Sequence, residues 1–358
     1  MSILNWASDN KYYDDIYFNF SIKGNLCDYT INKKNKYKIL SAIKWKQNNF
    51  FRNVFICCCK ETKKKIKEIK KLNIDNKFYK KKHISLLKSN LQKAIRRKLK
   101  DNAIKTAVSL ILIEDENEKI IQIGLFELLR RLCIIIIEDV ILMYEFNIIF
   151  WFHVLLSKGY ILNKYFIDII LLTIAKITTF EYQDKKYLNF LIHKDIKIIE
   201  MINDSKLTSK QRDLLTSLQF RKSYGGMNGD MFMIDKCTYI WYDRFKNNKP
   251  GEMYMYNYLF KENIIMNVLN PKDILKEAYD FHCTDICQRI NNNLKNDLIN
   301  EDLIKKLIWN NSSSINERFD INLSKFSNNN EFKNHEYWNC VKQLRDVEVN
   351  KLFYKYFG

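Results

Sequence analysis

The sequence contains little glycine and almost no proline, with 8 Gly and 2 Pro in 358 residues, where about 7% and about 5% are usual. Sandwiches, propellers and Rossmann enzymes need many turn glycines, so this scarcity argues against all three. The remainder is ordinary for a folded protein, with 47% hydrophobic and 28% charged residues. We therefore expect a mainly α fold, with a helical bundle core and a small strand-containing N-terminal region.

The N-terminus lacks the apolar segment of a secretory leader, because Asp9, Asp14 and Asp15 stand within it. The nine cysteines are an odd number and three are consecutive, which argues against a disulfide framework. The most apolar stretch, 132–156, contains three acids, each costing about 2.5–3.5 kcal/mol at a bilayer centre. We expect a buried helix pair there, no transmembrane segment, and an intracellular protein of the cytoplasm or nucleus.

Composition divides the chain into a small aromatic, strand-containing region (1–59), a basic segment (60–100), an apolar helical core (101–220) and a helical C-terminal region with Gly-rich and Asn-rich loops (221–358). Strand patterns occur at 17–22 and 54–57. The core contains three runs with helical periodicity, at 126–144, 148–156 and 165–180. Short breaks separate these runs, so we expect helices that pack as close neighbours.

Positive charge is concentrated in the basic segment. The formal net charge of the chain is +19, and residues 60–100 hold 17 Lys or Arg against three acids. AT-rich coding favours lysine over arginine, but a uniform bias would not cluster the lysines. Apolar residues recur through the segment at helical spacing, which predicts an amphipathic helix with a basic face. Such a face fits a nucleic acid, a solvated surface, or an acidic protein or lipid surface.

The nucleic-acid hypothesis assigns phosphate contacts to this segment and to an arginine pair further along the chain. The arginine pair has a second interpretation, a partly buried ion-pair network with Glu138 and Asp139 that pins two helices. The predicted contact residues are Lys80, Lys81, Lys82, Lys93, Arg96, Arg97, Lys100, Arg130 and Arg131.

Four short sequences occur in the order Leu-Gln-Lys-Ala-Ile-Arg-Arg (91–97), Asp-Asn-Ala-Ile (101–104), Leu-Arg-Arg-Leu (129–132) and Glu-Asp-Val (138–140). In them the chain resembles the helical C-terminal part of the replication-associated recombination ATPases of the clamp-loader (AAA+) clan. The ATPase core has no counterpart, because no Gly-x-x-x-x-Gly-Lys-Ser/Thr phosphate loop is present. The resemblance therefore implies a helical oligomerisation or DNA-associated module without ATP hydrolysis. The Lys-, Asn- and Ile-rich composition is similar to that of proteins from large DNA viruses.

Three of the eight glycines lie in one loop, Ser223–Met231, directly after a basic pair. Clustered glycines indicate backbone with positive φ or close approach of another group. The loop fits a tight turn with Asp230 as the next N-cap, a phosphate-binding loop, or catalysis through Asp230. Its candidate ligand residues are Arg221, Lys222, Gly225, Gly226, Gly229 and Asp230.

His282, Cys283 and Cys287 are residue types that bind Zn²⁺, and the two cysteines have the spacing of one helix face. A structural zinc site normally has a second pair, which the sequence lacks, so we expect neither a metal nor a cofactor. The adjacent His and Cys also suggest a nucleophile pair, for which no orienting third group is evident.

Together, these patterns favour a non-enzymatic accessory protein in replication, recombination or genome packaging that binds nucleic acid, DNA more than RNA, without sequence specificity. The first alternative is a structural or assembly protein that binds acidic proteins. The second is an enzyme of unrecognised type with a pocket at the Gly225–Asp230 loop. Homo-oligomerisation is left open.

Overall fold

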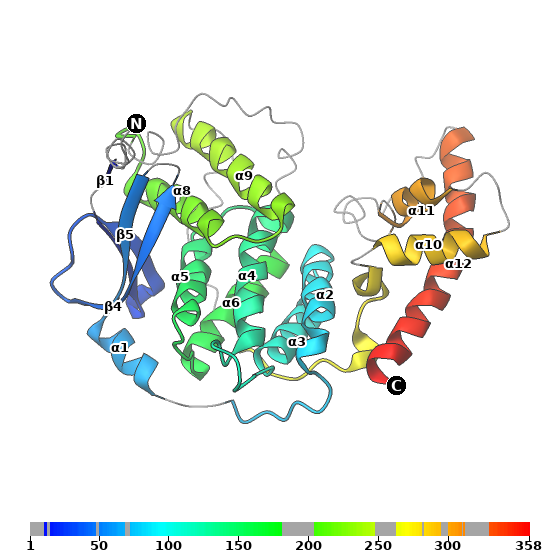
Figure 1. Ribbon diagram of the computed structural model, residues 1–358, viewed down its shortest axis with the longest axis horizontal. Helices are drawn as coiled ribbons and strands as arrows, with labels where there is room; N and C mark the ends of the chain where they lie inside the picture. Colours follow the sequence, from blue (N-terminus) through cyan, green and yellow to red (C-terminus); the bar gives the residue numbers. More distant parts are fainter. Residues whose placement is uncertain are drawn as a thin grey trace, which may run out of the picture. The chain divides into compact units, whose positions relative to one another are not determined.

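The computed structural model contains two compact units (Figure 1). Its described residues are 11–12, 15–47, 50–68, 72–180, 204–247, 263–280, 283–294, 300–309, 311 and 329–358. Unit 1 comprises Met1–Asn73, Asp115–Thr173 and Phe180–Asn263, and unit 2 comprises Ile74–Glu114, Ile174–Thr179 and Ile264–Gly358. Each unit is assembled from separate segments, whereas the four regions delimited by composition are continuous.

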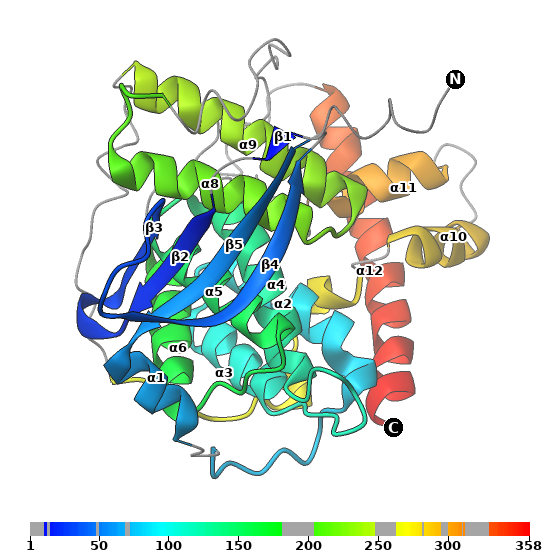
Figure 2. The same cartoon turned by 60° about the vertical axis from the view of Figure 1, so that its left-hand side comes forward.

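Unit 1 contains a five-stranded mixed sheet (Figure 2). Its strands are β1 (Lys11–Tyr12), β2 (Ile16–Ser21), β3 (Leu26–Thr30), β4 (Tyr37–Gln47) and β5 (Phe50–Cys59). β2 pairs antiparallel with β3, and β4 pairs antiparallel with β5. The two hairpins join because β2 runs parallel to β5. β1 pairs in parallel with the beginning of β5, so β1 and β2 occupy successive stretches of one edge of β5.

This sheet corrects the fold class expected from the sequence. The described residues are mostly helical, but the expected helical bundle core is wrong, because the sheet forms a full layer against which helices of unit 1 pack. The strand patterns at 17–22 and 54–57 do correspond to β2 and β5. β4 was not predicted. A bulge between Ile39 and Ser41 shifts its register and interrupts the alternation of side chains in its first half, whereas residues 43–46 still alternate.

The described helices of unit 1 are α1 (Lys60–Lys67), α4 (Ile123–Ile135), α5 (Glu145–Ser157), the first part of α6 (Lys164–Thr179), α8 (Ser209–Ser223) and α9 (Asn228–Lys246). The helical runs expected at 126–144, 148–156 and 165–180 correspond to α4, α5 and α6. The first run ends as an α-helix earlier than expected, because a π-helical turn at Ile136–Val140 follows α4.

One face of the sheet packs on α5 and α8 through aromatic rings. The ring of Phe20 on β2 lies 4.8 Å from that of Trp151 on α5, measured between centroids. Trp45 on β4 lies 5.2 Å from Phe220 on α8, and all four side chains are buried. Side chains alternate along a strand, so Tyr17, next to Phe18 on β2, belongs to the opposite face.

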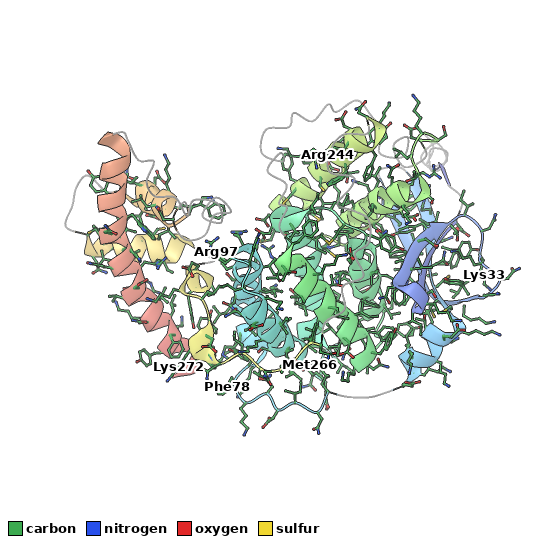
Figure 3. The ribbon with its side chains drawn as sticks, turned by 180° about the vertical axis from the view of Figure 1, so that it is seen from behind. Lys33, Phe78, Arg97, Arg244, Met266 and Lys272 are labelled. Atoms are coloured by element: carbon green, nitrogen blue, oxygen red, sulfur yellow. The ribbon has the colours of Figure 1, made fainter. Side chains whose placement is uncertain are left out.

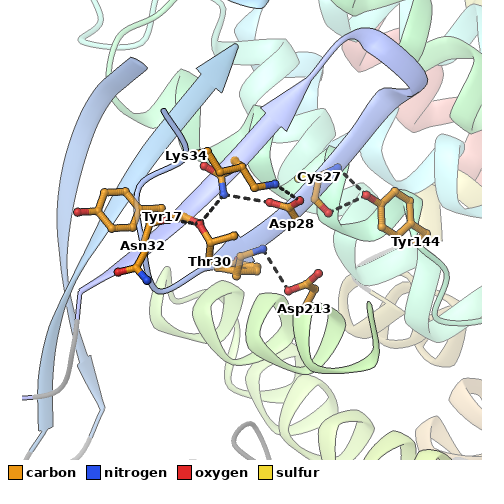
Figure 4. A network of polar contacts seen from close by, with 10 residues as sticks. Tyr17, Cys27, Asp28, Thr30, Asn32, Lys34, Tyr144 and Asp213 are labelled. Carbon is orange, nitrogen blue, oxygen red and sulfur yellow. Dashed lines mark hydrogen bonds and ion pairs between the residues drawn. The ribbon is translucent and has the colours of Figure 1, made fainter. Parts of the chain in front are cut away.

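Side chains cover the outer edge of β3 (Figure 4). The Cys27 N–H donates to the Tyr144 hydroxyl, which in turn donates to the Cys27 carbonyl at 2.7 Å. The Tyr29 N–H donates to Asp213 Oδ1 at 3.1 Å. Because an uncovered strand edge pairs with other chains, these contacts reduce the tendency of unit 1 to aggregate.

The apolar stretch 132–156 consists of the end of α4, the π-helical turn and most of α5. Its acids are accommodated inside unit 1: Asp139 is buried, and Glu138 lies 4.0 Å from the Arg131 guanidinium. Within the described residues, no helix is both long enough and apolar enough to cross a membrane.

The described helices of unit 2 are α2 (Ile84–Arg96), α3 (Lys100–Ile111), the end of α6, α10 (Cys283–Asn293), α11 (Glu301–Ile308) and α12 (Asn329–Phe357). α10, α11 and α12 share an apolar core that includes Ile290, Leu307 and Val341. The stretch 264–280 is bound to α2 through a hydrogen bond in which the Leu275 N–H donates to Asn90 Oδ1 at 2.8 Å.

Candidate nucleic-acid interface

The basic segment does not form the exposed face expected from its spacing. α2 is buried on most of its sides, and Lys93 and Arg96 are only 8% and 3% exposed. The prediction that both side chains lie on a solvent-facing surface is therefore wrong. Long polar side chains have apolar stems that pack against protein as readily as their ends reach water, so spacing alone does not reveal which helix face is covered.

Arg97 and Lys100 lie at the turn between α2 and α3, where both are half-buried (Arg97 in Figure 3). Lys100 lines a cavity of about 670 Å³ together with Lys105, Asp101 and Asp273. Two lysines and two acids line this cavity, so it offers phosphate no excess of positive charge.

Lys80–Lys82 are exposed, directly before α2. The turn that carries them is anchored to the end of α12. The His83 ring stacks on Phe357 with centroids 5.0 Å apart, and Lys82 Nζ donates to the Tyr356 carbonyl at 3.2 Å. The exposed lysines therefore lie on a turn that α12 holds in place.

The structure brings the arginine pair together with the glycine-rich loop. Arg130 and Arg131 lie on α4, and the loop joins α8 to α9. Arg221, near the end of α8, donates to the Gly225 carbonyl at 2.9 Å and to the Arg130 carbonyl at 3.4 Å. Arg131 Nη1 lies 3.5 Å from Asp230 Oδ1.

Acidic side chains neutralise this arginine cluster. Arg130 Nη1 lies 3.2 Å from Glu127, and Lys222 Nζ lies 2.9 Å from Asp235. The Gly225 N–H already donates to the Lys222 carbonyl at 3.0 Å, which removes one donor from any phosphate cradle. The geometry favours an ion-pair network between α4, α8 and α9 over a phosphate-binding or catalytic loop.

Two titratable groups near Arg221, the His153 ring and the Cys133 thiol, are uncharged at neutral pH. Burial, followed by the charges of Arg221 and Arg130, holds the pKa of His153 well below its ordinary value. Burial raises the pKa of the Cys133 thiol to about 11, against a smaller opposing effect of Arg221. Because a thiolate is the nucleophilic form of cysteine, Cys133 is unsuited to covalent catalysis at neutral pH.

The glycines of the loop differ in their tolerance of a side chain. Gly226 has a φ of +150°, and a Cβ added there would lie 3.0 Å from Met231 Cε. Gly229 lies in the first turn of α9, and a Cβ there would meet no atom within 4 Å. The N-cap of α9 is Met227, so the expected capping role of Asp230 is wrong.

Replacing Gly226 with alanine is expected to lower the free energy of unfolding by about 1–3 kcal/mol, because alanine is strained at this φ. Gly229→Ala makes the same chemical change within a helix, where alanine is favoured by up to about 1 kcal/mol. Urea denaturation of both variants measures the difference. Equal effects would contradict a strained turn at Gly226.

The proposed zinc residues fall only partly within the described chain. His282 lies outside the described residues, Cys283 begins α10, and Cys287 is buried in the core that α10 shares with α11 and α12. Among the residues that the structure describes, no group of three or more His, Cys, Asp or Glu is placed to hold a metal. The zinc and Cys–His hypotheses thus gain no support from the described part of the chain.

A further basic surface, not expected from the lysine spacing, lies on the sheet of unit 1. Residues 15–68 contain thirteen Lys or Arg and four Asp or Glu. Lys44 and Lys46 of β4 are exposed, as is Lys33 in the loop before β4 (Figure 3). The alternation of these exposed lysines with the buried Trp45 is the signal that would have identified the strand and its solvent-facing side.

Comparisons of the chain with protein-family models, with curated proteins and with solved structures found no match. They do not bear on the resemblance to the helical part of the clamp-loader-clan ATPases, which stays a prediction. The function is therefore argued from the residues and their geometry.

Proposed function

We propose that this protein binds nucleic acid without sequence specificity, through contacts from exposed lysines to phosphates. The observation that carries the proposal is the exposure of clustered lysines: Lys80–Lys82 before α2, and Lys44 and Lys46 on β4. A net charge of +19 supports the same partner, since it attracts polyanions over distance. The biological context that we infer is an accessory role in replication, recombination or genome packaging.

The residues assigned to phosphate contact differ from those expected at first. Lys93 and Arg96 are buried, and Arg130 and Arg131 have acidic neighbours in unit 1. A charge reversal at Arg96 would place an acid in a buried position and unfold the helix rather than test binding. The exposed lysines are the positions where charge can be changed without disturbing the core.

The experiment is a salt titration of binding to a random-sequence duplex. Binding releases condensed counterions, so raising the salt weakens it. A complex with about six phosphate contacts loses about a thousandfold in affinity between about 50 and 200 mM salt. The variant Lys80→Glu/Lys81→Glu leaves the Lys82 contact with Tyr356 in place. It is expected to bind every duplex more weakly and to reduce the slope of log K against log salt by about 1.8.

Lys305→Glu/Lys306→Glu on α11 is the matched control, because both lysines are exposed and the change in net charge is the same. Equal losses in the two variants would show that overall charge, rather than the Lys80–Lys82 surface, drives binding. Absence of binding to duplex and to single strand alike at about 50 mM salt would overturn the proposal and favour an acidic protein as the partner.

A further inference from the structure

The face of the sheet opposite α5 and α8, here called the outer face, carries aromatic and basic side chains. In Figure 2 the strands pass in front of α5, so this face is turned toward the reader. Tyr17 of β2 and Phe55 of β5 are paired in the parallel register. Their rings stack with centroids 5.1 Å apart and planes inclined by 20°, and both side chains are half-buried.

A second aromatic position lies further along β5. Phe51 has the same strand parity as Phe55 and therefore belongs to the same face. Four residues of strand separate the two rings by about 13 Å, so they are independent positions. Lys46 is paired with Phe51 across the β4–β5 ladder, and its Nζ lies 5.5 Å from the Phe51 ring centroid.

Lysines border this aromatic surface along β4 and the loop before it. Lys44, paired with Asn53, and Lys46 are exposed on β4, and Lys33 and Lys36 are exposed in the loop. The acids nearest to them in the strands are engaged with protein partners. Asp15 accepts a hydrogen bond from Asn53 Nδ2 at 2.9 Å, and the Asp28 carboxylate pairs with Lys34. The surface therefore combines rings with an excess of positive charge.

From this arrangement we infer that the outer face binds single-stranded nucleic acid, with bases stacked on Tyr17, Phe55 and Phe51 and phosphates bound by Lys44 and Lys46. Bases of a duplex are stacked on one another and do not reach a sheet surface, whereas the bases of a single strand turn outward and stack on aromatic rings. Every base can stack on an aromatic ring, so this mode of binding has no sequence specificity, as the proposed function requires. The inference rests on the proposed function and names its substrate class.

The first test removes the rings and keeps their apolar bulk. Tyr17→Leu/Phe55→Leu is expected to weaken binding of an oligo-dT strand about tenfold or more, and to leave duplex binding unchanged. Tyr165→Leu, at an exposed aromatic of α6, is the control and is expected to change neither. Oligo-dT and oligo-U of equal length are compared, because DNA and RNA strands share the chemistry of stacking and differ in the 2′-hydroxyl.

The second test removes positive charge from lysines that are exposed, so the substitutions leave the core unchanged. Lys44→Gln/Lys46→Gln is expected to reduce the salt slope for oligo-dT by about 1.4. Lys158→Gln/Lys206→Gln, at two other exposed lysines of unit 1, is the matched control. Ultraviolet cross-linking of oligo-dT to the wild-type protein is expected to label peptides of β2 and β5.

The results separate this inference from the proposed function. If the wild type binds duplex and single strand, and both outer-face variants match their controls, the single-strand site is overturned while nucleic-acid binding stands. Cross-links confined to other elements would also overturn the site. If neither duplex nor single strand binds at low salt, both proposals fail.

Discussion

Replacing Phe18 with alanine is expected to lower the free energy of unfolding of unit 1 by about 3–5 kcal/mol. Phe18 is fully buried on β2, where its ring stacks on Tyr29 of β3 at 4.2 Å between centroids. It also reaches both covering helices, with Phe150 of α5 at 5.9 Å and Phe220 of α8 at 6.5 Å. Removal of the ring leaves a cavity where the sheet and both helices meet, and rigid neighbours close such a cavity only in part.

Urea denaturation followed by circular dichroism measures this loss, and hydrogen exchange of the β2 amides assigns it to unit 1. Phe232→Ala on α9 is the control, because its side chain is 63% exposed and the same truncation should cost less than about 0.5 kcal/mol. A Phe18→Ala variant as stable as the control would contradict the packing of the sheet on α5 and α8.

Replacing Asp213 with asparagine is expected to remove a large pH dependence of stability. Burial, aided by the charge of Asp28, raises the pKa of Asp213 to about 7 from an ordinary 3.8, against opposing effects of the Tyr29 N–H, Arg212 and Lys34. Between these two values the folded protein binds a proton that the unfolded chain releases. The free energy of unfolding therefore falls as pH rises through this window, by about 4 kcal/mol in total.

The asparagine side chain has an oxygen that can accept the hydrogen bond from the Tyr29 N–H. Unlike the carboxylate, it carries no charge that must be buried. Wild type and Asp213→Asn should have similar stability near about pH 4, and the variant should be more stable by about 4 kcal/mol near about pH 8. Asp168→Asn makes the same change at a surface ion pair with Lys164 and is the control. A stability difference that is constant with pH would rule out a raised pKa for Asp213 at the edge of β3.

The helical part of the fold could be predicted because its information is local. The apolar periodicity of the runs at 126–144, 148–156 and 165–180 is a property of neighbouring residues, and it located α4, α5 and α6. The sheet depends on distant pairings: β2 and β5 meet through residues such as Tyr17 and Phe55, which no local pattern joins. For this reason a layered unit was expected to be a helical bundle.

The candidate site was predicted less well than the helices. Charge clustering identified Lys80–Lys82, which are exposed, together with Lys93 and Arg96, which are buried. Local spacing shows that a helix is amphipathic, and only the tertiary fold decides what covers each face. Arg131 and Asp230, 99 residues apart, were each identified from the sequence as separate candidates, but their pairing became evident only in three dimensions.

The anchoring of the Lys80–Lys82 turn by α12 has a consequence for the synthesis of the chain. His83 and the Tyr356 carbonyl that it contacts are 273 residues apart. At ribosomal rates of synthesis, the end of α12 is therefore made roughly 10–60 s after the turn. During that interval His83 and Tyr79, which both pack on Phe357 in the finished protein, lack this cover. Charges beside such rings act as gatekeepers against self-association, so the same three lysines protect the nascent chain until α12 emerges.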